Sequence, residues 1–418
     1  MELKRVVVTG LGAITPLGLN VEETWQNLLE GKSGCGPVTL IDASKFKTQF
    51  ACEVKGFDPT LYFEKKEVSR VDRYTQFAFA AADEAIKDSG LDLETADKKR
   101  IGVIYSSGIG GIKSFHEETK GYSDERGPRY NPFFIPKIIA DIAAGQLSIK
   151  YGFLGPNFGC VSACASATHG MINAFDLIRL GKADMIVAGG AEAPISEPGL
   201  GGFNAMKALS TRNDDPEHAS RPFSASRDGF VMGEGSGCLI LEELEHAKAR
   251  GAKIYAEVVG GGMSADAYHL TATHPEGLGA KYVMEAALED AGMKPEDIDY
   301  INVHGTSTHV GDISEAKAIK EIFGEAAYKL NISSTKSMTG HLLGAAGAIE
   351  ALFCVKSVQC DIVPPTINHN EDDKDEEIDY NLNFTFNKAQ KRVVRAALSN
   401  TFGFGGHNGS IIVKKYVD

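Results

Sequence analysis

The sequence predicts an α/β protein made of two copies of one unit, for three reasons. Short apolar segments typical of strands buried on both faces alternate with helical patterns along the 418 residues. Helices that end in glycine recur before a strand in each half of the chain. Each half also closes with a glycine-led strand. The matching segments are 84–90 with 286–292, 101–105 with 300–303, and 235–241 with 408–413. The boundary falls near residues 249–253, which gives predicted domains 1–251 and 252–418.

The chain opens with a strand at residues 6–8 that runs into a turn containing Gly10 and Gly12. This pattern is similar to the start of a dinucleotide-binding fingerprint. The third glycine of that fingerprint is missing, because Thr15 and Pro16 stand there. We therefore interpret the turn as structural.

Periodicity and the positions of glycine and proline predict the remaining elements. Prolines prevent a long helix between residues 112 and 140, and a long Gly/Pro/Asn loop is expected up to Asp228. The acidic run 371–377 is interpreted as a solvated surface loop. The expected helices are 21–31, 74–89, one that follows Cys164, and 344–356, and the expected strands are 100–105, 184–188 and 237–242.

The composition argues against several classes of protein. A net charge of −13, with no basic cluster among aromatic residues, is unlike that of a nucleic-acid-binding protein. No apolar run approaches the roughly 18 residues of a membrane span, and the N-terminal run is too short for a signal peptide. The seven cysteines are scattered without a C-x-x-C pair, which indicates a reducing compartment. We expect a cytoplasmic protein that binds neither membranes nor nucleic acid.

The stretch around Cys164 is the first candidate for chemistry. Small residues at 159–170 lead directly into an apolar helix pattern. A cysteine at the start of a helix faces unpaired backbone N–H groups and the positive end of the helix dipole, and both favour the thiolate. The alternative is a buried structural cysteine, which is the usual fate of a free cysteine.

Three further stretches carry candidate residues. His304 follows a strand, and α/β proteins bind ligands at such carboxyl ends. Lys336 and His341 precede a second small-residue helix, and the internal repeat places His341 near the position equivalent to Cys164. Phe404 lies between glycines, which supply the backbone freedom that a gate or an amide-presenting turn needs. The structural alternatives are a histidine bonded to a loop, an exposed lysine and a core aromatic residue.

A cysteine with two separate histidines points to covalent acyl chemistry. No histidine pair at i, i+4 and no cysteine partner has the spacing of metal ligands, so no metal is expected. His169 is nearest to Cys164 in sequence, but five helical residues turn it away, and we expect it to be packed. Cys160 is interpreted as structural.

Together these motifs resemble the elongating β-ketoacyl-[acyl-carrier-protein] synthases over nearly the whole chain. The motifs are SACAS at 162–166, HGTST at 304–308, KSMTGH at 336–341 and GFGG at 403–406. The stretches 208–213, 221–223 and 227–230, with Ile109 in its Gly-Ile-Gly-Gly turn, look most like type II, the form that handles longer and unsaturated acyl chains. The resemblance implies a thiolase-like duplicated αβαβα five-layer fold and a homodimer.

The resemblance also implies catalytic roles in a ping-pong reaction. Cys164 would take the acyl chain from its carrier as a thioester. His304 and His341 would bind the thioester carbonyl of malonyl-acyl-carrier protein and assist decarboxylation. The resulting carbanion would attack the acyl group on Cys164 and so elongate a fatty acid chain. The backbone N–H groups of Cys164 and Phe404 would hold the second oxyanion.

Lys336 would tune His341 electrostatically rather than react. We expect Asp312 and Glu315, which follow the HGTST motif, to pair with Lys336. Thr306 and Thr308 would hydrogen-bond the pantetheine arm, while Phe404 gates the acyl pocket and Ile109 forms its floor. The full set of expected substrate-binding residues is Ile109, Phe203, Thr271, Thr306, Thr308 and Phe402.

An acidic carrier protein requires a local basic patch on a chain of negative net charge. The resemblance places carrier-docking cations at Lys65, Lys66, Arg70 and Lys207. The alternative for each is a solvated surface cation. No cofactor is implied beyond the phosphopantetheine of the carrier, which brings the malonyl and acyl thioesters.

Two departures from the family pattern lie near the site. His309 and Val310 stand where Pro-Ala is common, and His407 replaces a threonine of many type II members. Neither position has a catalytic role in the family, but both can change the local polarity.

Four competing interpretations remain to be weighed. A degradative thiolase would carry a second catalytic cysteine near the C-terminus, where this chain has the GFGG motif at 403–406. A starter-unit synthase would carry His and Asn partners, whereas His341 occupies the second position here. A chain-length-factor subunit would lack Cys164. A polyketide ketosynthase has nearly the same motifs and stays open.

Overall fold

The computed structural model describes residues 3–120 and 129–417. Its main feature is a ten-stranded sheet with the strand order β10-β9-β13-β14-β8-β1-β7-β6-β4-β5. The strands from the first half of the chain are β1 (Val6–Ile14), β4 (Ile101–Ser106), β5 (Asn157–Phe158), β6 (Met185–Glu192) and β7 (Gly235–Glu243). Those from the second half are β8 (Ala256–Ala265), β9 (Tyr300–Asn302), β10 (Asn331–Ser333), β13 (Ala396–Gly403) and β14 (His407–Lys414).

The two halves of this sheet repeat one another. The order β5-β4-β6-β7-β1 and the order β10-β9-β13-β14-β8 are the same when strands are counted along the chain. The pairing directions match too: β4 is parallel to β5 and β6, as β9 is to β10 and β13. The other pairings within each half are antiparallel. This repeat confirms the duplicated unit that the sequence predicts.

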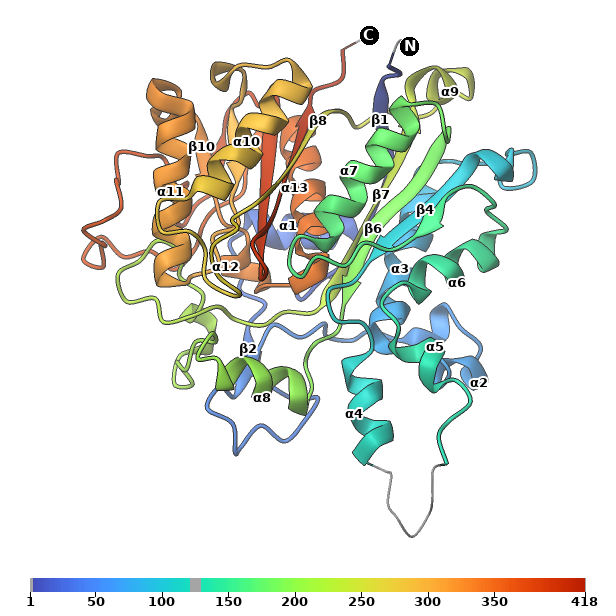
Figure 1. Ribbon diagram of the computed structural model, residues 1–418, viewed down its shortest axis with the longest axis horizontal. Coiled ribbons are helices and arrows are strands. Elements are labelled where there is room, and N and C mark those ends of the chain that lie inside the picture. The colour runs from blue at the N-terminus through green and yellow to red at the C-terminus, as the bar shows by residue number, and fades with distance from the viewer. Residues whose placement is uncertain (1–2, 121–128, 418) are drawn as a thin grey trace.

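Helices complete five layers (Figure 1). α7 (Ser166–Arg179) and α13 (Ala346–Cys360) contact each other, and they lie between the two halves of the sheet, α7 on β6 and β4, α13 on β13 and β7. α3 (Arg73–Asp88) and α6 (Ile142–Tyr151) cover the outer face of the first half. α10 (Leu278–Ala291), with α11 (His309–Phe323) beside it, covers the outer face of the second. The thiolase-like αβαβα expectation is therefore confirmed.

The remaining elements surround one end of these layers or edge them. They are α1 (Val21–Leu29), α2 (Lys65–Val68), α4 (Ile112–Lys120), α5 (Phe134–Ile138), α8 (Glu197–Ala205), α9 (Leu244–Ala249), α12 (Lys336–Thr339), β2 (Gly36–Pro37), β3 (Phe50–Ala51), β11 (Ile362–Val363) and β12 (Gln390–Lys391). The expected helices at 21–31 and 74–89 are confirmed to within two residues.

The helix α13 is buried on almost every side because it lies between the two halves of the sheet. By length and composition the stretch Leu343–Cys360 could cross a membrane, although Glu350 and Lys356 interrupt it, and 83% of it is buried inside the molecule. Core helices pass the same test, so its packing accounts for its apolar character.

One expectation from the sequence is wrong, and another holds only in part. The long loop before Asp228 contains the helix α8, which Ser196 caps by accepting a hydrogen bond from the Gly199 N–H, and which has a proline in its first turn. The three glycines in its sequence argue against a helix, which is why the sequence does not predict it. The acidic run 371–377 is not wholly solvated, because Asp375 is 8% exposed and its carboxylate lies 2.8 Å from a nitrogen of Arg227.

Gly12 shows how closely β1 and α3 pack. A Cβ atom at this position would stand 1.8 Å from the carbonyl oxygen of Ala81 in α3. We predict that Gly12→Ala lowers the free energy of unfolding by about 1–3 kcal/mol, the usual cost of overpacking a core. The urea denaturation midpoint measures this change. Gly36→Ala, in β2, is the matched control, because the nearest atom to its Cβ is 4.0 Å away. Equal midpoints for the two variants would contradict the prediction.

Candidate active site

Cys164 lies in a tight turn between β5 and α7. Ala163 before it has a φ of +50°, in the left-handed region, and α7 begins two residues later at Ser166. The Ser162 N–H donates to the Ser166 Oγ at 2.9 Å, and that hydroxyl donates to the Ala163 carbonyl at 2.6 Å. These bonds fix the turn and direct the sulfur toward the second half of the chain.

Two histidines from the second half meet Cys164. His341 Nε2 lies 3.0 Å from the Cys164 sulfur. The His304 ring lies 5.2 Å from the His341 ring, centroid to centroid, at an interplanar angle of 88°. Phe230 packs edge-on against His341 at 5.4 Å, and Phe402 lies 5.6 Å from His304, so aromatic rings hold both imidazoles in place.

The internal repeat relates the Cys164 loop to the loop that follows His341. The structure refines which residues of the two loops are equivalent. Leu343 has a φ of +46° and stands three residues before α13, as Ala163 stands three residues before α7. Gly344 therefore occupies the position equivalent to Cys164, and His341 lies three residues earlier. The two helix starts still converge on one site, as expected.

Lys336 is buried behind the histidines and pairs with Glu350 of α13. The expected pairing with Asp312 and Glu315 is wrong. Asp312 instead faces Arg227 at 3.3 Å, and the two Glu315 oxygens accept the backbone N–H groups of His304 and Gly305, each at 2.9 Å. The lysine partner comes from a helix that no motif in the sequence marks.

Burial raises the pKa of the Cys164 thiol to about 12, while the positive charge of Lys336 and a hydrogen bond from the Phe404 backbone oppose this rise. The expected thiolate at the helix start is therefore not supported. Desolvation of the fully enclosed sulfur outweighs the groups that favour the anion. The Cys164 side chain is therefore a thiol beside an imidazole at neutral pH.

Burial also lowers the pKa of His304 and of His341 well below the ordinary value, and the charge of Lys336 lowers both further. Both rings are therefore neutral near pH 7, and each carries one N–H. Their Nδ1 atoms have no hydrogen-bond partner among the described residues. A neutral ring can donate one hydrogen bond to a substrate oxygen without bringing a second positive charge beside Lys336.

Glu192 and Glu315 are site residues that sequence reasoning missed or misassigned. Burial raises the pKa of each carboxyl to about 7. Glu192 accepts bonds from the Ser107 hydroxyl at 2.7 Å, from the Gly108 N–H at 2.7 Å and from the Gly344 N–H at 2.9 Å. It thus ties the turn that holds Ile109 to the loop that follows His341. The sequence offered no signal beyond a carboxylate at the end of an apolar strand.

A cavity of about 480 Å³ opens above the sulfur. Its lining includes four of the five expected catalytic residues, Cys164, His304, His341 and Phe404, while Lys336 lies behind them. It also includes every expected substrate-binding residue, namely Ile109, Phe203, Thr271, Thr306, Thr308 and Phe402. The structure therefore brings these residues together around one cavity.

The GFGG turn lies against the Cys164 loop. A Cβ on Gly403 would stand 2.9 Å from the Ser162 carbonyl oxygen and 3.1 Å from the Cys164 nitrogen. The Phe404 ring leans toward Phe203 of α8, at 6.3 Å between centroids. The Phe404 backbone hydrogen-bonds the Cys164 sulfur, and Gly403 packs against the Cys164 backbone, so both residues of the expected oxyanion hole adjoin the sulfur.

The expected carrier-docking cations lie outside the cavity. Lys65 and Lys66 are in α2, and Arg70 follows that helix, with its guanidinium 5.0 Å from the Phe133 ring centre. Lys66 pairs with Glu64 at 2.8 Å on the surface. Lys207 follows α8, next to the lining residue Met206.

Three further histidines have defined positions. His169 is packed: Nδ1 lies 2.8 Å from the Ser162 hydroxyl and Nε2 lies 3.0 Å from the Asn408 carbonyl oxygen. His309 lines the cavity mouth, and His407 is exposed at the start of β14. No cluster of three or more His, Cys, Asp or Glu residues within 3–120 and 129–417 could hold a metal ion.

Comparison with family models gives two matches that together span most of the chain. Residues 3–247 match the model described as "Beta-ketoacyl synthase, N-terminal domain", and residues 255–370 match "Beta-ketoacyl synthase, C-terminal domain". Among curated proteins, "3-oxoacyl-[acyl-carrier-protein] synthase 2" of Staphylococcus aureus (strain COL) is 49% identical over 413 residues, 99% of each chain. The protein of the same name from Coxiella burnetii is 48% identical over 418 residues, 100% of each chain.

Solved structures of ketosynthases are also similar to this chain. A β-ketoacyl synthase from Burkholderia phymatum has a TM-score of 0.90 and 34% identity, and the match covers 99% of this chain and 100% of that one. A ketosynthase described as bound to a hexaketide, in complex with its type II PKS acyl-carrier protein, has a TM-score of 0.89 and 33% identity, with both chains fully covered.

Alkylation of Cys164 tests the state of its thiol. Because the raised pKa keeps the sulfur protonated at neutral pH, we predict that its rate of reaction with iodoacetamide rises continuously between pH 6 and pH 9. Intact mass spectrometry measures the rate, and Cys164→Ala identifies labelling of other cysteines. A plateau already reached below pH 7 would mean that the helix start holds a thiolate after all.

Proposed function

The chain belongs to the β-ketoacyl synthase family, and on this premise we propose that it is a type II β-ketoacyl-[acyl-carrier-protein] synthase of fatty acid elongation. It catalyses the decarboxylative condensation of malonyl-acyl-carrier protein with an acyl chain held on Cys164. One observation carries the proposal: a buried thiol lies 3.0 Å from His341 Nε2, and His304 stands across the same cavity.

The first half-reaction loads the enzyme. The Cys164 sulfur attacks the acyl-carrier thioester carbonyl, and His341 Nε2 accepts the thiol proton, since it is the ring nitrogen in contact with the sulfur. The proton passes to the departing pantetheine sulfur, so that the histidine ends neutral. The low pKa of His341 makes its protonated form short-lived, which favours this onward transfer.

The second half-reaction removes CO2 from malonyl-acyl-carrier protein. Cleavage of the bond to the carboxylate leaves its electron pair on the thioester enolate, whose oxygen carries the charge. His304 donates its N–H to that oxygen, and His341 adds a second donor in the tautomer that carries its proton on Nε2. Their neutral state matters, because a neutral donor is poised without repulsion from the nearby Lys336.

Carbon–carbon bond formation completes the cycle. The enolate carbon attacks the acyl carbonyl on Cys164, and the backbone N–H groups of Cys164 and Phe404 stabilise the tetrahedral oxyanion. Collapse of that intermediate expels the Cys164 sulfur, which takes up a proton from solvent, and releases β-ketoacyl-acyl-carrier protein. Ile109, Phe203 and Phe402 supply apolar surface for the acyl chain.

Relatives support fatty acid elongation over polyketide assembly. The curated 3-oxoacyl-[acyl-carrier-protein] synthase 2 proteins are 48–49% identical to this chain. The polyketide ketosynthase that was solved with its carrier is 33% identical. That complex also supports an acyl carrier protein as the partner of this chain. Seven free cysteines agree with a cytoplasmic location, which we propose with the same function.

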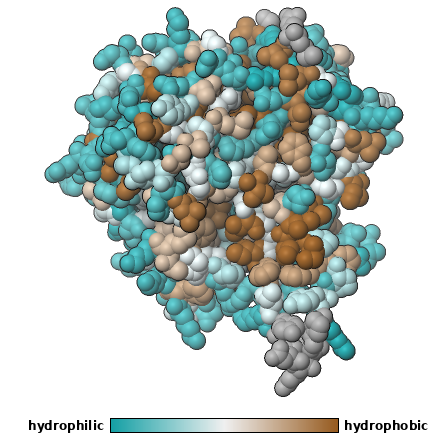
Figure 2. Space-filling view, viewed as in Figure 1, coloured by the Kyte–Doolittle hydropathy of each residue, from teal (hydrophilic) through white to brown (hydrophobic). Residues whose placement is uncertain are grey.

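We also propose that the enzyme is a homodimer that pairs through the β5 edge. β5 is the last strand of the sheet, and an unpaired edge favours pairing with another strand. Ile149, Leu154 and Val161 near this edge are 82%, 69% and 62% exposed. Apolar residues also gather on the lower part of the face in Figure 2, where Figure 1 shows α4 and α5, and Phe115 and Ile135 are exposed there.

Acylation assays test the catalytic assignment. We predict that intact mass spectrometry detects an acyl adduct on the wild-type enzyme and none on Cys164→Ala. His304→Ala should still form the adduct but lose malonyl decarboxylation by roughly 100-fold or more, because it removes one of two donors to the enolate oxygen. Absence of the wild-type adduct with a competent acyl carrier would overturn the proposed function. Loss of acylation in His304→Ala would assign that residue to thiol activation instead.

Charge reversal tests the docking cations. We predict that the double variant Lys66→Glu, Arg70→Glu raises the KM for acyl-carrier substrates, and that the increase shrinks as salt is added. Lys207→Glu, beside the cavity, should have a similar effect. Lys99→Glu is the control, since this exposed lysine lies before β4, at the opposite end of that strand from the site. An unchanged KM for the double variant would remove α2 from the docking surface.

A further inference from the structure

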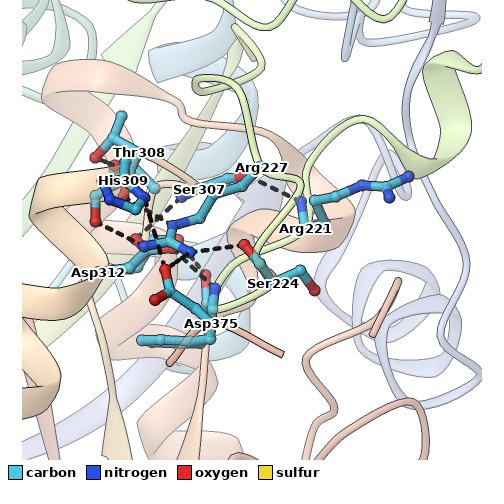
Figure 3. Close-up of polar contacts among 12 residues, drawn as sticks. Arg221, Ser224, Arg227, Ser307, Thr308, His309, Asp312 and Asp375 are labelled. Carbon is cyan, nitrogen blue, oxygen red and sulfur yellow. Dashed lines mark hydrogen bonds and ion pairs between the residues drawn. The ribbon is translucent and has the colours of Figure 1, made fainter. Parts of the chain in front are cut away.

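Arg227 is fully buried, and its guanidinium is shared among three segments of the chain (Figure 3). One nitrogen lies 2.8 Å from Asp375 in the acidic segment 371–377, and another lies 3.3 Å from Asp312 in α11. The stretch 227–230 contributes to the family resemblance, but the proposed mechanism gives this arginine no role. A buried cation that satisfies two carboxylates is costly to desolvate, so its placement calls for an explanation.

The same guanidinium binds the backbone of the loop that carries the expected pantetheine ligands. Arg227 donates to the Thr308 carbonyl at 3.2 Å and to the His309 carbonyl at 2.7 Å. It also donates to the Ser224 carbonyl at 2.6 Å. The Thr306 and Thr308 hydroxyls lie 3.0 Å apart on the cavity side of this loop. The guanidinium thus binds the backbone of this loop, whereas the two threonines line the cavity.

Asp312 extends this support to the centre of the loop. It accepts the Ser307 N–H at 3.2 Å and the Phe223 N–H at 2.9 Å. Ser307 has a φ of +69°, in the left-handed region, a conformation that the surroundings must impose on a serine. The Ser307 hydroxyl also accepts the Arg221 N–H at 3.0 Å. The loop is therefore held in one unusual conformation by the segment 221–227.

The catalytic histidine of the loop has a separate anchor. Glu315 accepts the N–H groups of His304 and Gly305, each at 2.9 Å, without contact to Arg227 in the described structure. The two ends of the loop are thus supported independently. Glu315 sets the position of His304, and Arg227 sets the position of Thr308.

The helix itself does not account for the arginine. α11 begins at His309, and a cation beside a helix N-terminus is unfavourable toward the dipole. Asp312 and Asp375 compensate that charge. His309 stands at the first helical position, where proline is commonly favoured, and Arg227 contacts its carbonyl rather than its side chain. This explains how the family's proline can be replaced here while the anchor is kept.

We propose that Arg227 is a positioning residue that sets Thr306 and Thr308 for the amide-bearing pantetheine arm, independently of the chemistry at Cys164. The inference rests on the proposed function. It predicts that damage to Arg227 harms reaction with donors that carry the arm much more than reaction with donors that lack it.

The experiment compares acylation of Cys164 by an acyl group on acyl carrier protein with acylation by the same acyl group as an S-ethyl thioester, which has no amide. Intact mass spectrometry measures both rates. Arg227→Lys keeps the buried charge but cannot span three carbonyls and two carboxylates. We expect the rate with the carrier donor to fall roughly ten- to a hundredfold, mainly through KM, because small displacements of a binding group have effects of that size. The rate with the S-ethyl donor should change less than about threefold.

Two further variants secure the interpretation. Arg100→Lys is the matched control, because Arg100 also binds a carboxylate and two carbonyls, those of Asp184, Gly181 and Lys182, away from the cavity. It should leave both rates unchanged. Asp375→Asn weakens the ion pair between Asp375 and Arg227. It should shift the ratio of the carrier-donor rate to the S-ethyl-donor rate in the same direction by a smaller factor. This variant keeps the test valid if Arg227→Lys folds poorly.

The outcomes are distinct. An equal loss with both donors, or no loss with either, in variants that keep the wild-type melting temperature overturns the role of Arg227. Failure of the wild-type enzyme to accept an acyl group from either donor overturns the proposed function itself. A selective loss with the carrier donor supports the positioning role, since a general structural defect would reduce both rates together.

Discussion

The contact between the Cys164 sulfur and His341 Nε2 is the constraint on which the rest of this structure depends. The two residues come from different halves of the chain, so the contact requires both sheets, with α7 and α13 between them, to be in their correct places. It also requires dehydration, and dehydration sets the chemistry. The same burial that keeps the thiol protonated keeps both imidazoles neutral. The site therefore works by neutral donors and brief proton transfers rather than by standing charges.

The charges that do persist lie one layer behind the reacting groups, and each has a defined neighbour. Lys336 faces Glu350, and Arg227 faces Asp312 and Asp375. Glu192 and Glu315 are enclosed carboxyls that collect backbone N–H groups from the loops they hold. Such interactions are weak evidence for stability. Their common effect is to fix loop conformations that glycine-rich and small-residue sequences would not hold unaided.

Much of the fold could be predicted from the sequence because its signals are local. Strand and helix periodicity, repeated in order, indicates the duplication, and four motifs identify the residues around the cavity. The supporting residues could not be predicted in this way. Glu350 lies in an apolar helix and Asp375 in a run of acidic residues, so nothing local distinguishes them from solvated carboxylates. α8 was hidden because its glycines weigh against a helix, whereas its cap at Ser196 and its packing decide the outcome. The state of the thiol depends on enclosure, which only three-dimensional packing determines.

Gly344 occupies the place in the second unit that Cys164 holds in the first, and it has no room for a side chain. A Cβ there would stand 2.2 Å from the Gly108 nitrogen and 2.6 Å from a Glu192 oxygen. A second nucleophile at that position is therefore sterically incompatible with the acyl-pocket turn as it stands. In the proposed mechanism the two units have different tasks: the first supplies the attacking sulfur, and the second braces the pocket turn and presents the histidines. The two units keep equivalent backbone folds, but they carry different functional residues.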